Sequence, residues 1–123
     1  MAVLELTQDI FEPTILNNDF IIIDFWAPWC APCRAFAPVF EAAAEKHPGI
    51  VFAKVNTEEE QEIAGNFQIR SIPTLMIFRE KVIIFSQPGS LPASALDDLI
   101  IQAQQLEMAQ VHREIAEEHA AKS

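Results

Sequence analysis

The sequence has 123 residues, of which 50% are hydrophobic and 21% are charged, which predicts one globular domain and excludes a disordered or collagen-like chain. Eight basic side chains against eighteen acidic ones give a net charge of −10. A field of that sign repels phosphate backbones and anionic lipid surfaces, so we expect neither nucleic acid nor a membrane as a partner.

The first residues carry no targeting pattern. The first positive side chain is Arg34, and the apolar run over residues 20–23 is interrupted by Asp24. A secretory signal needs a basic segment followed by a continuous apolar one, and a membrane span needs about 20 apolar residues. We therefore expect a cytoplasmic protein.

Hydrophobic periodicity alternates along the chain between the spacing of strands and that of helices, which predicts an α/β fold. A first strand is expected over residues 3–7, followed by a short helix over Thr14–Leu16 with Pro13 in its first turn. Residues 20–25 are apolar on both alternating faces, as in a central strand that is covered on both sides. A long helix then begins at Cys30.

The second half of the chain predicts a further strand, a short helix and a hairpin. The strand covers residues 50–55, and Thr57 with Glu60 is expected to form a capping box for a helix that Gly65 closes. The neighbouring acids are assigned to the helix dipole rather than to a metal. Two strands over 74–78 and 82–85 are joined by a link too short for a parallel crossover, so we expect them to be antiparallel.

The C-terminal segment carries two apolar stripes. A helix beginning at Pro92 is expected to pack one of them on the sheet, namely Leu96, Leu99, Ile100, Ala103 and Leu106. The side chains of Met108, Val111 and Ile115 fall on a face turned away from it, so one straight helix cannot bury both. Three interpretations stay open for this extension: a frayed tail, self-association, or docking of a client or partner.

Both cysteines lie together, directly after the predicted central strand and at the start of the long helix. There the backbone amides and the helix dipole favour a thiolate at Cys30. The spacing also allows Cys33 to reach the sulfur of Cys30, either to close a disulfide or to attack a mixed disulfide formed on it. This arrangement predicts a two-step redox cycle.

Two other interpretations of a CxxC pair are half of a zinc site and a structural staple. A closed zinc site needs four Cys or His ligands, yet His47, His112 and His119 are scattered and there is no third cysteine. A disulfide that closes so short a loop constrains the unfolded chain very little. The redox interpretation is favoured, and we expect no metal.

Two segments resemble the thioredoxin family. Residues 23–34, Ile-Asp-Phe-Trp-Ala-Pro-Trp-Cys-Ala-Pro-Cys-Arg, are similar to its active-site segment, and residues 69–75, Ile-Arg-Ser-Ile-Pro-Thr-Leu, to the segment that carries its cis-proline. The resemblance runs from about residue 2 to residue 105. It implies a mixed central sheet of about five strands flanked by helices. We expect a thioredoxin domain over 1–105 and a C-terminal helical extension over 106–123.

The resemblance also implies roles at the dithiol. Cys30 would be the attacking thiol and Cys33 the buried resolving thiol, with Trp29 and Pro32 shaping the exposed rim. Pro32 stiffens the turn and lacks an amide hydrogen, which removes one donor to the sulfurs. Ala31 stands where the family usually has glycine, at a pair of positions that influences the redox potential. The family's glycine between the last two strands is also absent, replaced by Glu80 and Lys81, which affects the hairpin and not the dithiol, and a neutral effect is expected.

Asp24 is the one acid in an otherwise apolar strand. Burial there should raise its pKa and suit it to accept a proton. By resemblance, Asp24 would deprotonate Cys33, with Lys54 on the next strand as its charge partner. The alternatives are a purely structural buried acid at Asp24 and a solvent-facing side chain at Lys54.

The second motif implies a cis peptide bond between Ile72 and Pro73. Such a bond beside the dithiol would present the backbone of Ile72 to an extended substrate peptide, next to Trp29. Because main-chain pairing does not depend on side chains, a broad range of protein substrates is expected.

The resemblance implies a disulfide reductase that acts on client proteins. No bound cofactor is expected, and the electrons would come from an NADPH-dependent flavoprotein, a thioredoxin reductase. One alternative is a thioredoxin-like chaperone or adaptor in which the cysteines are secondary and the extension is a docking element. Another is an oxidase or isomerase, which would need a more oxidising potential at the same site.

Overall fold

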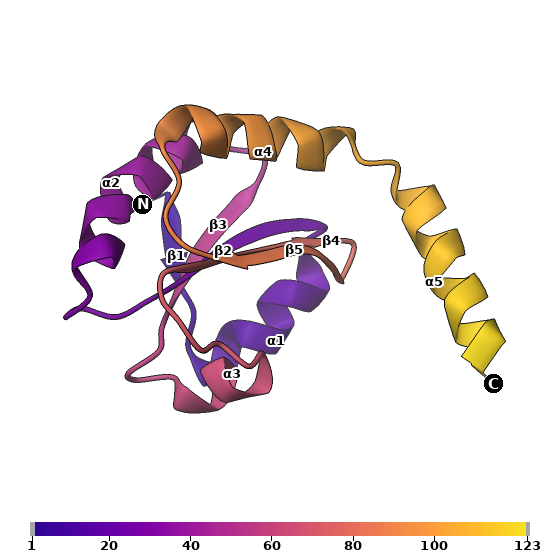
Figure 1. The fold of residues 1–123 in the computed structure, drawn as a ribbon, viewed down its shortest axis with the longest axis horizontal. Coiled ribbons are helices and arrows are strands. Elements are labelled where there is room, and N and C mark those ends of the chain that lie inside the picture. Colours follow the sequence, from indigo (N-terminus) through magenta and orange to yellow (C-terminus); the bar gives the residue numbers. More distant parts are fainter. Residues whose placement is uncertain (1, 123) are drawn as a thin grey trace.

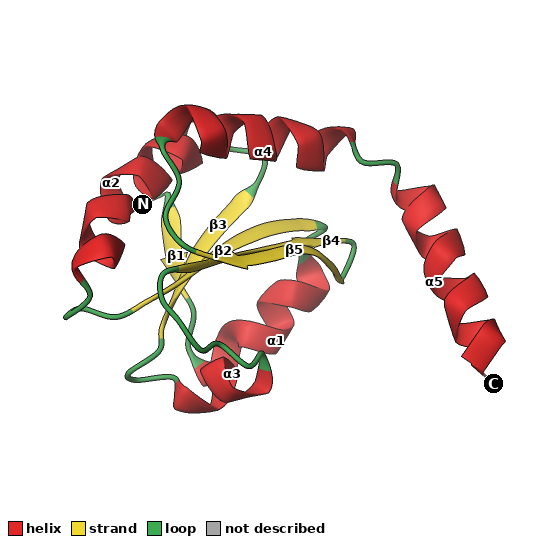
Figure 2. Ribbon diagram, in the orientation of Figure 1, coloured by secondary structure: helices red, strands yellow, loops and turns green. Residues whose placement is uncertain are grey.

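The computed structural model describes residues 2–122, in which a five-stranded mixed β-sheet lies between two layers of helices (Figure 1). Figure 2 shows the sheet as the central layer of the domain, with loops at both of its ends. The elements, in chain order, are β1 (Val3–Glu5), α1 (Gln8–Asn17), β2 (Phe20–Trp26), α2 (Ala31–Lys46), β3 (Val51–Asn56), α3 (Gln61–Asn66), β4 (Thr74–Arg79), β5 (Val82–Pro88), α4 (Ala93–Gln105) and α5 (Met108–Lys122).

The sheet confirms the expected fold class. Its strand order is β1-β3-β2-β4-β5, so β2 is central, pairing parallel with β3 and antiparallel with β4. Strands β4 and β5 form the predicted antiparallel hairpin. Helices α2 and α4 cover one face of the sheet and α1 and α3 the other (Figure 1). This double coverage explains why β2 is apolar on both sides.

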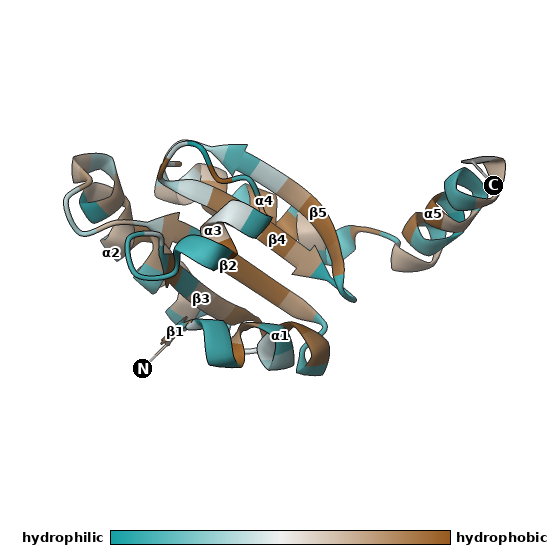
Figure 3. Ribbon diagram, turned by 90° about the horizontal axis from the view of Figure 1, so that it is seen from below, coloured by the Kyte–Doolittle hydropathy of each residue, from teal (hydrophilic) through white to brown (hydrophobic). Residues whose placement is uncertain are grey.

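Alternation along β2 divides the core into two clusters. Ile22 belongs to the cluster beneath α2 and α4, whereas Ile21 and Ile23 belong to the cluster on the side of α1 and α3. Figure 3, which looks at the molecule from below, shows the strands as largely hydrophobic bands. The same alternation places Asp24 on the side of Ile22, beneath the helix that carries Cys33.

The first helix is longer than predicted. It begins at Gln8, with Pro13 in its interior rather than in its first turn. A proline inside a helix removes one backbone hydrogen bond. Phe11 and Ile15, one turn apart on either side of Pro13, pack against the sheet cluster, and this packing holds the helix through the proline.

The predicted capping box of the third helix is wrong. Helix α3 begins at Gln61 without a side-chain cap, and the Thr57 hydroxyl donates instead to the Trp26 carbonyl. The Glu60 carboxylate accepts a hydrogen bond from the backbone N–H of Gln8, at the start of α1. These residues join neighbouring elements, which local sequence spacing cannot indicate.

The β4–β5 turn forms without the glycine that such turns favour. Glu80 and Lys81 have φ angles of 51° and 70°, so both occupy the left-handed region. Two-residue hairpin turns with positive φ at both central positions favour Asn and Gly because other side chains are disfavoured there. The hairpin therefore keeps its topology in spite of an unfavourable turn sequence.

The C-terminal segment consists of two helices rather than one. Helix α4 ends at Gln105 and α5 begins at Met108, with an extended backbone at Leu106 between them. Leu96 and Ile100 are buried as predicted, but Leu106 is exposed because the helix has already ended there. Helix α5 projects away from the sheet and its covering helices (Figure 1).

The segment from the end of α4 into α5 is joined to the end of the β4–β5 hairpin by two contacts. Met108 is buried, and a guanidinium N–H of Arg79 donates to the carbonyl of Ala103, 2.7 Å away, at the end of α4. Further along α5, the His112 ring lies 2.8 Å from the Glu80 carboxylate. Beyond this point Ile115 is 44% exposed. No helix within residues 2–122 has both the length and the apolar character needed to cross a membrane.

Candidate active site

The two cysteines form a disulfide at the start of α2. Their Cα atoms are 5.2 Å apart, and Cys30 is the N-cap of the helix, where its sulfur accepts a hydrogen bond from the N–H of Cys33 at 3.3 Å. A helix N-terminus presents unpaired amides and a positive dipole end, which stabilise a negatively charged sulfur. The structure therefore shows the oxidised form of a pair whose reduced form would carry its thiolate at Cys30.

The residues beside the disulfide follow from the start of this helix. Ala31 and Pro32 are the first two residues of α2 and both are exposed. Proline is favoured in the first turn of a helix because an N–H group at that position would have no intrahelical acceptor. Cys30 and Cys33 are each almost completely buried, at 5% and 2% exposure, so the dithiol is reached only over its rim.

Trp29 forms part of that rim. Its side chain is 65% exposed, and its indole N–H donates a hydrogen bond to the carboxylate of Glu58. The loop that holds Glu58 is organised by Asn56, whose side-chain oxygen accepts from the Glu58 N–H at 2.9 Å. In the sequence, Glu58 is one of the acids next to Glu60 that are expected to complement the helix dipole, and nothing there indicates this contact. No local signal could reveal it, because 29 residues separate the partners.

The loop before β4 lies against the disulfide, as predicted from the second motif. The Ile72–Pro73 peptide bond is cis, and the carbonyl oxygen of Ile72 lies 3.7 Å from the Cys30 sulfur. Ile72 also packs against the small apolar cluster that surrounds both cysteines. The carbonyl of Pro73 accepts from the N–H of Gly89 at 2.8 Å, which ties this loop to the segment after β5.

Asp24 is buried, with an exposure of 4%. Desolvation raises the pKa of Asp24 from 3.8 to about 7, and the positive charge of Lys54 lowers it by a smaller amount. One of its carboxylate oxygens, Oδ1, is buried without a hydrogen bond to any residue among 2–122. A carboxyl group with this pKa can take up and release a proton near neutral pH.

Lys54 lies on the neighbouring strand at the position paired with Asp24 in the parallel register. Its side chain is half-buried, and its ammonium group lies 5.1 Å from the centre of the Trp26 ring. A cation over an indole face is stabilised by the ring quadrupole. The register puts Lys54 on the face of the sheet that carries Asp24, with its side chain partly exposed to solvent.

The described part of the chain contains no group of three or more His, Cys, Asp or Glu side chains that could hold a metal ion. The groups that the site itself offers for chemistry are two sulfurs, one buried carboxyl group and a nearby ammonium group.

Comparison with known proteins agrees with both motifs. The family model of thioredoxin matches residues 2–102. A thioredoxin homologue from Streptomyces coelicolor is 52% identical over 119 residues, covering 97% of this chain and 89% of that protein. The thioredoxin of Porphyra purpurea is 41% identical over 102 residues, covering 81% of this chain and 95% of that protein.

The chain belongs to the thioredoxin family. Solved thioredoxin structures share its fold. That of Plasmodium falciparum thioredoxin superposes with a TM-score of 0.75 at 32% identity, over 80% of this chain and 97% of that one. A mutant thioredoxin from Halobacterium salinarum gives 0.78 at 31% identity, over 85% and 93% of the two chains.

Family membership and the Cys30–Cys33 pair make the protein a thiol-disulfide oxidoreductase, and more specifically a protein-disulfide reductase. Its thioredoxin relatives imply disulfide-containing substrates and a thioredoxin reductase as partners, and no bound cofactor is needed for the exchange. The chaperone or adaptor alternative, in which the cysteines are secondary, is not favoured.

The Streptomyces relative also bears on the C-terminal segment. Its alignment spans 119 of the 123 residues of this chain, so it extends well into α5. The family model ends at residue 102, before α5 begins. Helix α5 is thus an addition to the common thioredoxin domain that aligns with a segment of this relative.

Proposed function

We propose that Cys30 is the attacking thiol and Cys33 the resolving thiol of a two-electron exchange. The Cys30 thiolate attacks one sulfur of a substrate disulfide, which breaks that bond, forms a mixed disulfide and releases the other sulfur as a thiolate. Cys33 then attacks the Cys30 sulfur, forms the disulfide seen here and releases the reduced substrate. The position of Cys30 as the N-cap of α2 supports this order of attack.

We further propose that Asp24 accepts the proton of Cys33 in the second step. Its burial beneath α2 and its pKa of about 7 support the role, because such a carboxylate takes up a proton at neutral pH and can return it. Lys54 would be a positioning residue whose charge keeps part of the Asp24 population ionised.

Substrate binding is proposed at Trp29, Ile72 and Pro73. The exposed indole offers an apolar surface, held in place by Glu58. The 3.7 Å approach of the Ile72 carbonyl to the Cys30 sulfur is the observation that carries the proposal, because a peptide paired along this backbone would bring its disulfide to the attacking sulfur.

We propose a cytoplasmic reductase that receives electrons from an NADPH-dependent flavoprotein, with Ala31 and Pro32 tuning the potential. Equilibration with redox buffers tests this: a potential near −270 mV, as in thioredoxin, supports it, whereas one near −180 mV, as in protein disulfide isomerase, indicates an oxidase or isomerase. For the chain's organisation we propose a domain over 1–105 and an extension over 106–123. The exposed Ile115 of that extension leaves an apolar side chain available for self-association, and sedimentation of the chain without residues 106–123 tests it.

Trapping experiments test the site. A Cys33→Ser variant should accumulate a mixed disulfide with a disulfide-containing client protein, because the second attack is removed. The matched Cys30→Ser variant should accumulate none, because it lacks the thiol at the N-cap of α2, where the helix N-terminus favours the thiolate. Equal trapping by both variants would contradict the assigned order. For Asp24, the rate of mixed-disulfide resolution in Asp24→Asn should fall, and the rise of that rate near pH 7 should be lost, so that only the titration of the Cys33 thiol shapes the profile between about pH 6 and 9. An unchanged profile would remove the proposed role of Asp24.

A further inference from the structure

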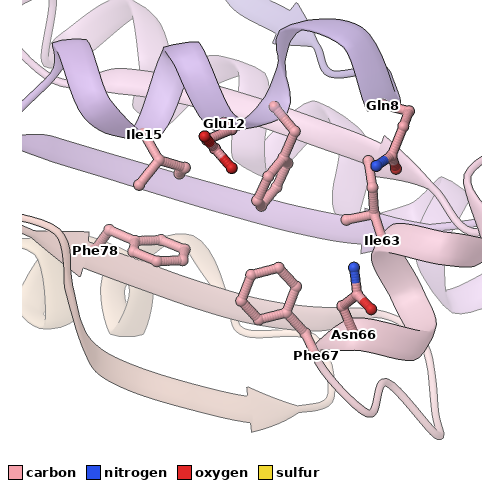
Figure 4. A pocket seen from close by; sticks show the side chains of 8 residues that line it. Gln8, Glu12, Ile15, Ile63, Asn66, Phe67 and Phe78 are labelled. Atoms are coloured by element: carbon pink, nitrogen blue, oxygen red, sulfur yellow. The ribbon is translucent and has the colours of Figure 1, made fainter.

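A hollow lies on the side of the sheet away from α2, between α1 and α3, and shares no residue with the dithiol site. Its volume is about 250 Å³. Figure 4 shows the side chains that line it, which are Gln8, Phe11, Glu12, Ile15, Ile63, Asn66, Phe67 and Phe78. Sites for drug-sized ligands measure roughly 300–1,000 Å³, so this one suits a compact molecule.

The walls of the hollow are apolar and fixed by ring contacts. The ring of Phe67 lies 5.4 Å from that of Phe11 and 6.1 Å from that of Phe78, between ring centres. Phe67 also contacts Phe25 in the central strand, at 6.3 Å. A wall that is held by the core in this way keeps its shape without a ligand, which lowers the entropic cost of binding.

The three polar side chains at the hollow are exposed to solvent. Within residues 2–122, no hydrogen bond or ion pair engages the side chains of Gln8, Glu12 or Asn66. Figure 4 shows the Glu12 carboxylate and the Asn66 amide pointing toward the space that the phenyl rings border. A few convergent polar groups on an apolar wall are typical of a ligand site.

The only formal charge at the hollow is negative. Glu12 is the only ionisable side chain among the eight that line the hollow, and no basic residue is present there. The faces of aromatic rings are also negative and attract cations. We propose that the hollow binds a small organic ammonium ion that carries one compact apolar group, with the ammonium at Glu12 and the apolar group against Phe67.

The test titrates the full chain with three probes of one shape: 2-phenylethylammonium, neutral 2-phenylethanol and anionic 3-phenylpropionate. With ¹³C-labelled isoleucine methyl groups, the cation should cause saturable shifts at Ile15 and Ile63, and intermolecular NOEs should place its phenyl protons against Ile63. The alcohol should bind more weakly and the anion most weakly. Equal affinity for the cation and the alcohol, or the absence of saturable shifts at both methyl groups, would overturn the proposal.

Matched variants distinguish binding of the cation at the hollow from its attraction to the overall negative charge of the protein. Glu12→Gln should weaken binding of the cation roughly two- to fivefold, the effect of one exposed ionic contact, and leave binding of the alcohol unchanged. Asp9→Asn removes the same charge from the same helix at a residue outside the hollow, and should leave both affinities unchanged. Equal losses in the two variants would show that the cation responds only to the overall charge.

Discussion

At the scale of single residues, Asp24 combines a proposed proton-transfer role with an energetic cost. It is buried, one of its oxygens has no partner among the described residues, and its pKa is raised to about 7. A carboxyl group whose pKa is higher in the folded state than in the unfolded state destabilises the fold as it ionises. The protein therefore retains an acid that favours chemistry at the expense of stability.

We predict that Asp24→Asn stabilises the protein in a pH-dependent way. At pH values well below 3.8 the carboxyl is neutral in both states, so the variant and the parent should differ little. As pH rises from about 4 to 7, the Asp24 carboxyl ionises freely only in the unfolded state of the parent. The folded parent therefore loses stability relative to the variant. The full shift, from 3.8 to about 7, corresponds to roughly 4 kcal/mol as an upper limit above pH 7.

Urea unfolding of the oxidised proteins at a series of pH values measures this difference. Asp19→Asn is the control, because Asp19 is an exposed acid next to the same strand and its replacement should change the free energy of unfolding by less than about 0.5 kcal/mol. A gain for Asp24→Asn that is independent of pH would contradict the linkage argument.

Much of the site could be predicted from local sequence because its chemistry depends on short spacings. Cys30 and Cys33 lie within one helical turn, and the motif before β4 correctly predicted the cis bond at Pro73. The contact between Trp29 and Glu58 could not be predicted, since the two meet only after β3 is paired beside β2. The face of the sheet on which Lys54 lies likewise could not be predicted without the register between β2 and β3.

At the scale of elements, the β4–β5 turn shows where tertiary pairing prevails over local preference. The hairpin was predicted from the shortness of its link, and it forms even though Glu80 and Lys81 both have positive φ angles. The energy that holds it comes from pairing of β4 with the central strand. For the same reason α1 runs through Pro13, which local preference would place in a first turn.

We predict that Lys81→Gly stabilises the protein by about 0.5–1 kcal/mol. Glycine removes the cost of the left-handed conformation at φ 70°, and the greater entropy of the unfolded glycine offsets part of that gain. Lys81→Ala keeps a Cβ atom and should give no gain. Denaturant unfolding of both variants checks this, and equal stabilisation by Ala and Gly would show that the side chain of Lys81, not the backbone, is responsible.

Helix α5 contacts the rest of the protein near its start. Two matched substitutions measure how much each part of the helix contributes to the free energy of unfolding. Met108→Ala should destabilise the protein by roughly 2 kcal/mol because its side chain is buried at the junction with α4. Ile115→Ala, on the exposed part of the same helix, should cost less than about 0.5 kcal/mol. Unfolding curves give both values. Similar costs for the two would mean that α5 packs along its whole length.

At the scale of the whole molecule, the layered fold places the dithiol at one end of the sheet and leaves the opposite helical face free. Helix α2 starts where β2 has ended, so its N-terminus and the cis-proline loop meet at the same edge. The hollow between α1 and α3 lies on the other face. A single small domain thus separates its redox surface from the hollow proposed to bind an ammonium ion.

The net charge of −10 should govern which disulfides the protein reduces fastest. A field of this sign attracts cationic substrates, and salt screens it, because the Debye length falls from about 30 Å at 0.01 M to about 8 Å at 0.15 M. For a disulfide peptide flanked by lysines, kcat/KM should therefore fall roughly tenfold between these ionic strengths. The same peptide flanked by glutamates should show the opposite trend, and a serine-flanked control should change little. If the lysine and glutamate peptides respond alike, the local rim at Trp29 and Ile72, rather than the field of the whole protein, controls the encounter.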